Sequence, residues 1–129
     1  MLICLITNTR RSLAAFGVVV SLSSGALAAD PEYLAAVADL PLPPGMVEEV
    51  DAGVSFDKPE GRIIEAVVRG AVVKADVAAF YRAALPGLGW QRLDSGPSDQ
   101  RWQRSGEVLN IKFVDGSNPL IVRFSIAPN

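Results

Sequence analysis

The sequence predicts an α+β domain in which one helix packs on an antiparallel sheet as a two-layer sandwich. Residues 74–85 form the one long segment whose apolar residues recur at helical spacing. Four short stretches follow without another helix, 90–93, 101–104, 108–114 and 120–126, and turn residues separate them. In the last two stretches apolar and polar residues alternate, so one face of the sheet should be apolar and covered by the helix.

Before this helix, residues 29–45 predict a short helix and a stiff lead-in. Asp30 and Pro31 are typical of a helix N-terminus, and apolar residues at helical spacing follow them. The proline-rich run 40–45 (LPLPPG) should be extended and should lead into the folded domain.

Residues 46–129 are then expected to form a single domain. Its first strands are predicted at 46–50, 54–56 and 62–69, the last being β-branched and alternating. The predicted order of the elements is β-β-β-α-β-β-β-β.

The first 28 residues predict a cleavable signal peptide. Arg10 and Arg11 precede an apolar run at 13–22, and residues 26–28 (ALA) match the small-residue pattern of a cleavage site. Cleavage is expected after Ala28 or one residue later. An apolar run of about 10 residues is too short for a membrane that needs about 20. We therefore expect an exported protein, periplasmic or secreted, with no membrane-spanning segment after cleavage.

Two export routes stay open. Residues 9–13 (TRRSL) resemble the start of a twin-arginine signal, but Ala14 and Ala15 depart from its usual continuation, which favours the general secretory route. Cys4 precedes the apolar run and would leave with the signal peptide, so no lipid anchor is expected.

Composition excludes several kinds of chemistry. The chain has no histidine and a single cysteine. Serine–histidine–aspartate and cysteine–histidine catalysis are therefore excluded, and so are zinc sites built from these residues. We expect no catalytic residue, no metal and no cofactor.

Charge is divided unevenly along the chain. Residues 30–60 carry eight acidic residues and one lysine, whereas residues 61–129 carry nine basic and six acidic residues. This basic excess is too small for nucleic-acid binding. The acidic part is expected to lie on the basic part.

Short motifs give no catalytic signature. Residues 55–58 (SFDK) match S-x-x-K, but they lie in a strand and turn with Pro59 next, and the partner motifs of that enzyme class are absent. The acidic residues near them lack the spacing of a calcium loop. These are Glu48, Glu49, Asp51 and Asp57.

The segments 80–82 (FYR), 85–86 (LP) and 88–90 (LGW) mark the passage from helix to strand. With this signature, residues 42–129 resemble a class of small exported bacterial domains of unknown function. The resemblance implies an envelope location and an α+β fold. It implies no site residue.

Arginine and aromatic side chains form the one grouping that predicts a binding site, because they recognise anionic groups. Trp102 lies in a hairpin between polar neighbours, which leaves two positions open for it, one in the core and one exposed at a binding surface. The interpretation favoured over binding is that Tyr81 and Trp90 belong to the core and the arginines to the wet face. The predicted partner- or anion-binding residues are Trp102, Arg101, Arg104 and Arg92.

Two classes of function follow. The preferred one is a non-enzymatic accessory module that binds an envelope protein or an anionic cell-wall component through the last four strands. The alternative is a small ligand carrier or hydrolase with a cleft between helix and sheet, flanked by Glu65 and Asp76. The oligomeric state is left open by the sequence.

Overall fold

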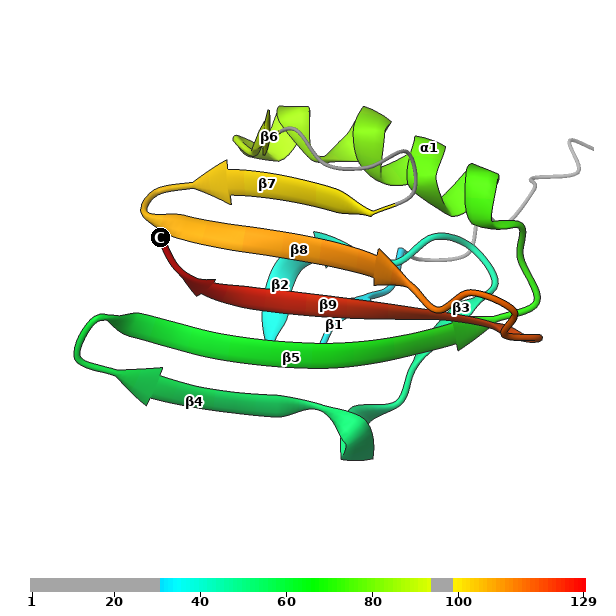
Figure 1. The fold of residues 1–129 in the computed structure, drawn as a ribbon, viewed down its shortest axis with the longest axis horizontal. Helices are drawn as coiled ribbons and strands as arrows, with labels where there is room; N and C mark the ends of the chain where they lie inside the picture. The colour runs from blue at the N-terminus through cyan, green and yellow to red at the C-terminus, as the bar shows by residue number, and fades with distance from the viewer. Residues whose placement is uncertain (1–30, 94–98) are drawn as a thin grey trace, which may run out of the picture.

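The computed structural model describes residues 31–93 and 99–129 and consists of a seven-stranded antiparallel sheet with one α-helix (Figure 1). The spatial order of the strands is β3-β5-β9-β8-β7-β6, and β4 pairs with the same edge of β5 as β3 does. The strands are β3 (Met46–Glu48), β4 (Val54–Lys58), β5 (Gly61–Gly70), β6 (Gln91–Leu93), β7 (Gln100–Arg104), β8 (Glu107–Phe113) and β9 (Leu120–Pro128).

Alternation along the strands creates one apolar face. In β5 the side chains of Ile64, Ala66 and Val68 are buried, and their cross-strand partners in β9 include the buried Val122 and Phe124. The residues between them face the other side of the sheet and are more exposed. A period of two therefore separates a core face from an open face.

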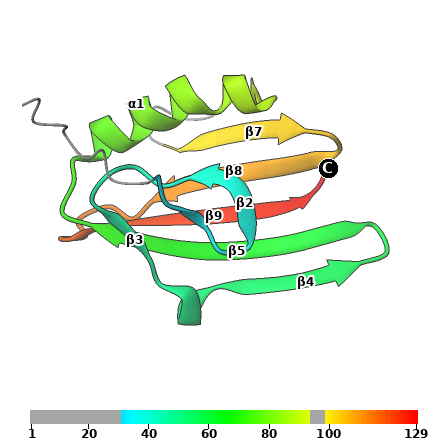
Figure 2. The same ribbon diagram turned by 180° about the vertical axis from the view of Figure 1, so that it is seen from behind.

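Two elements cover the core face, as the view from behind shows (Figure 2). Helix α1 (Lys74–Ala84) packs through Tyr81, whose ring lies edge-on to Phe124 at 5.4 Å between centroids. The hairpin of β1 (Tyr33–Leu34) and β2 (Val37–Pro41) lies beside it. The Tyr81 hydroxyl donates a hydrogen bond of 2.8 Å to the Pro41 carbonyl and so joins the two elements.

The short helix predicted near residue 30 is wrong for the described part of the chain. Residues 33–41 form the β1–β2 hairpin, and Leu34, Val37 and Leu40 are all at most 2% exposed. The predicted lead-in is likewise part of the core, because Leu42 is buried and its N–H donates to the Glu32 carbonyl at 2.7 Å. Burying these apolar side chains on the sheet outweighs the weak local helix signal.

The α+β class, the helix, and the meander of the last four strands are confirmed. The predicted element order is incomplete, because the β1–β2 hairpin adds two strands before it. The predicted signal peptide, 1–28, lies outside the described residues. Among the residues described here, no helix is long and apolar enough to cross a membrane.

Candidate functional site on the open face of the sheet

Trp102 is buried rather than exposed. It lies on the core face of β7, is 2% exposed, and donates through Nε1 to Gln100 Oε1 at 3.1 Å. Gln100 in turn donates to the Ala78 carbonyl of α1 at 2.9 Å. Trp102 therefore anchors the helix–sheet core and presents no surface to a partner.

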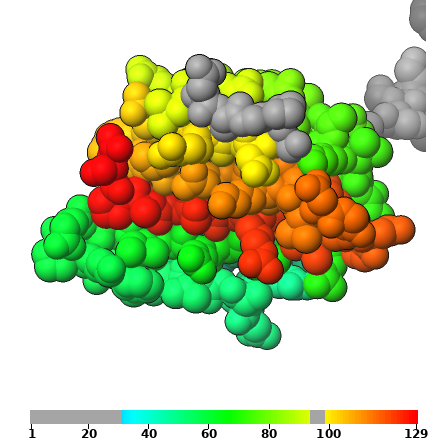
Figure 3. Space-filling view, in the orientation of Figure 1, coloured from blue at the N-terminus to red at the C-terminus, as the bar shows by residue number. Residues whose placement is uncertain are grey.

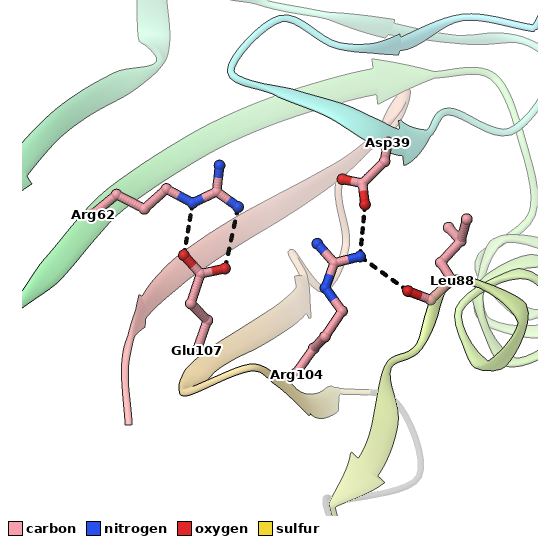
Figure 4. A network of polar contacts seen from close by, with 5 residues as sticks. All are labelled: Asp39, Arg62, Leu88, Arg104 and Glu107. Carbon is pink, nitrogen blue, oxygen red and sulfur yellow. Dashed lines mark hydrogen bonds and ion pairs between the residues drawn. The ribbon is translucent and has the colours of Figure 1, made fainter.

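Arg104 is held by three groups of the protein, and Figure 4 shows two of them, Asp39 and the Leu88 carbonyl. Its Nη1 lies 2.6 Å from Asp39 Oδ2 and donates to the Leu88 carbonyl at 3.0 Å. The guanidinium carbon stacks over the Trp90 ring at 4.3 Å from the centroid. Hydrogen bonding to Arg104 lowers the pKa of the Asp39 carboxyl below its usual range. Arg104 thus fastens β2 to β7 rather than meeting a ligand.

A second ion pair lies next to Arg104 in Figure 4 and joins β5 to β8. Arg62 makes two parallel bonds to Glu107, at 2.7 Å and 3.1 Å, and these raise the pKa of the Arg62 guanidinium. The Asp39–Arg104 pair is one contact in which the acidic segment lies on the basic one.

The other two predicted residues, Arg92 and Arg101, are exposed but face opposite sides of the sheet. Arg92 pairs with Trp102 across β6 and β7 and so lies on the core side, whereas Arg101 is the next residue along β7 and lies on the open side. The four predicted residues therefore do not form one surface. Only Arg101 belongs to the open face.

The open face brings two cations together, a pairing that alternation along single strands does not predict. Lys112 of β8 lies directly opposite Arg123 of β9, and both side chains are exposed. None of the ion pairs between described residues involves either of them. Like charges directly opposite each other destabilise a sheet. An anion held between the two side chains would offset this repulsion.

The two cations border a hollow of about 380 Å³ on the open face, whose other lining residues include Glu65, Val67 and Ser125. Figure 3 shows this face, with β4, β5, β9 and β8 running across it. Ser125 Oγ accepts from Asn110 Nδ2 at 3.3 Å, and its own proton is left for another acceptor. The hollow therefore offers two cations and a hydroxyl donor against a single carboxylate.

The space between α1 and the sheet is packed with side chains. Among the described residues Gln100 is the one buried polar side chain, and both ends of its amide are hydrogen-bonded. Glu65 lies on the open face, whereas Asp76 is exposed on the first turn of α1, so the two carboxylates do not converge. No cluster of metal-ligating residues occurs in residues 31–93 and 99–129.

The residues of the helix-to-strand signature hold the fold together. Tyr81 and Leu85 are fully buried and Trp90 is 3% exposed, while Gly89 adopts the left-handed conformation that turns the chain into β6. No family model, curated protein or solved structure matches the chain.

Proposed function

We propose that this protein is an exported, non-enzymatic binding module that holds an anionic cell-wall component on the open face of its sheet. Lys112 and Arg123 would bind the phosphate or carboxylate groups, and Arg101 would extend the contact along β7. The observation that carries the proposal is the direct opposition of Lys112 and Arg123 beside the hollow. Both are long cationic side chains with no acidic partner among the described residues.

A repeating polymer suits this site better than a small buried ligand. The hollow is open on the exposed face of the sheet, so it would enclose only part of any molecule that it contacts. Charge-assisted hydrogen bonds to successive anionic groups would supply affinity without enclosure. Such binding weakens as salt is added, because exposed charges are screened.

The proposal is tested by removing the two cations. Lys112→Ala with Arg123→Ala should weaken binding to polygalacturonate or to a polyphosphate by about tenfold or more in titration calorimetry, since two charge-assisted contacts are lost. The two probes separate carboxylate from phosphate preference, and neutral dextran should not bind. The same double variant should keep or slightly raise the free energy of unfolding, because a repulsive pair is removed.

The matched control is Arg82→Ala with Arg92→Ala, which removes the same charge from exposed positions away from the hollow. This control should bind as the unchanged protein does. An equal loss of affinity in both double variants would show that binding depends on net charge and not on this site. An unchanged affinity in the Lys112 and Arg123 variant would refute the proposed site.

Export is the second part of the proposal and has its own test. Protein produced from the full-length coding sequence in a Gram-negative host should be found in the periplasmic fraction, with a mature N-terminus at Ala29 or Asp30 by mass spectrometry. The reason is the run of Arg10, Arg11 and a short apolar segment before the ALA site. An intact Met1 in the cytoplasmic fraction would contradict it.

A further inference from the structure

Exposed apolar side chains gather at one edge of the sheet. Of the six large hydrophobic side chains exposed among the described residues, four lie in the continuous segment β3, η1 (Val50–Ala52) and β4. They are Val47, Val50, Val54 and Phe56. All five residues of β4 are exposed, and β4 forms the outer edge beside β5 in Figure 1. Long exposed edge strands are normally protected, because they can pair with another strand.

The backbone of β4 leaves two residues free to pair outward. Glu49 N–H donates to the Val67 carbonyl at 2.8 Å, so Val67 points its backbone groups toward this edge. By alternation Glu65 and Ile63 do the same, and their partners in β4 are Val54 and Phe56. Ser55 lies between these two partners and Asp57 follows Phe56. Both therefore direct their backbone N–H and C=O groups away from the sheet.

We infer that two copies of this chain pair antiparallel through β4, with a twofold axis at Phe56, and form one continuous sheet. In this register Ser55 of each copy lies opposite Asp57 of the other. Both residues point outward, so each pair exchanges two backbone hydrogen bonds. The two Phe56 residues then face each other as a closely spaced pair on the open side, where aromatic side chains stabilise a sheet.

Other registers fit less well. An axis at Asp57 sets the two Asp57 carboxylates opposite each other and places Pro59, which has no N–H, opposite Ser55. An axis at Ser55 places Asp57 opposite Gly53, where β4 has not yet begun. The axis at Phe56 uses the whole of β4 and sets no like charges opposite each other.

The same register brings complementary charges together. Lys58 lies opposite Val54 of the second copy, and the next residue in that row is Glu65, the β5 partner of Val54. Within one copy Lys58 and Glu65 are at opposite ends of the β4–β5 hairpin, so they meet only between copies.

The two hollows would lie on the same face, five strand spacings or roughly 24 Å apart.

Disulfide trapping tests the register. Because Cys4 is the only cysteine, Phe56→Cys is placed in a Cys4→Ser background of the full-length coding sequence. The two introduced cysteines should have Cα atoms about 4.5 Å apart and should form a disulfide-linked dimer under mild oxidation. Ser55→Cys is the matched control, since its Cα atoms would be roughly 8 Å apart, beyond disulfide range. Equal trapping at both positions, or at neither, overturns the proposed register.

Sedimentation measurements with charge reversal test the interface in solution. The unchanged protein should show a concentration-dependent dimer. Lys58→Glu should weaken it by about threefold, and Lys58→Glu combined with Glu65→Lys should restore it, as expected for an exposed ion pair between copies. A monomer at all concentrations, or pairing that neither reversal changes, overturns the inference. Circular dichroism confirms that each variant is folded.

Discussion

Trp102→Ala is expected to lower the free energy of unfolding by about 3–5 kcal/mol, enough to remove much of the stability of a domain of this size. Trp102 is 2% exposed, and its indole N–H donates to Gln100 at 3.1 Å. The substitution therefore opens a cavity and leaves the Gln100 carbonyl oxygen without its partner inside the core. Urea denaturation followed by circular dichroism measures the loss.

The control for this substitution is Arg101→Ala, the adjacent residue on the same strand. Its side chain is exposed on the open face, so the change in unfolding free energy should stay within about 0.5 kcal/mol. Trp102→Ala with unchanged stability would show that the indole is not part of the core. A large loss at Arg101 would show that the two faces of β7 are reversed.

Gly70→Ala is expected to be the most disruptive glycine substitution in the described residues. A Cβ atom at Gly70 would lie 2.3 Å from the Gly45 carbonyl oxygen and 2.8 Å from Met46 Sδ. The closer contact is with backbone, so β3 and the turn before it would have to move away from β5. Overpacking of this kind costs about 3 kcal/mol or more, which thermal or urea unfolding would detect.

Gly87→Ala is the matched control, because a Cβ atom there meets nothing within 4 Å. Its effect on the unfolding free energy should be within about 0.5 kcal/mol. If Gly70→Ala were equally mild, the close approach of the 43–46 segment to the end of β5 would be wrong.

The two faces of the sheet hold different kinds of side chain. The core face holds Trp102, Phe124 and Gln100, and no buried polar side-chain atom of the described residues lacks a hydrogen-bond partner. The open face holds Lys112 and Arg123, whose placement costs stability. A residue pair that weakens the fold is a better guide to binding than a buried aromatic residue that strengthens it.

Periodicity made the main elements predictable from the sequence. The helix at 74–85 and the strands after it were correctly expected, because a stripe of apolar residues at helical spacing and strict alternation are local signals. The β1–β2 hairpin was not, since Tyr33, Leu34 and Val37 fit a short helix as well as a strand. Only the sheet on which Leu34 and Val37 pack distinguishes the two.

The sequence by itself determined that this chain has no histidine and that one face of its sheet is apolar. Only the tertiary structure decided which side chains are buried and which side chains lie next to each other. Trp102 and Arg101 are neighbours in sequence but lie on opposite faces, and Lys112 and Arg123 are distant but directly opposed. The physical reason is strand register: alternation assigns a residue to a face, but only pairing with a particular strand assigns its neighbours.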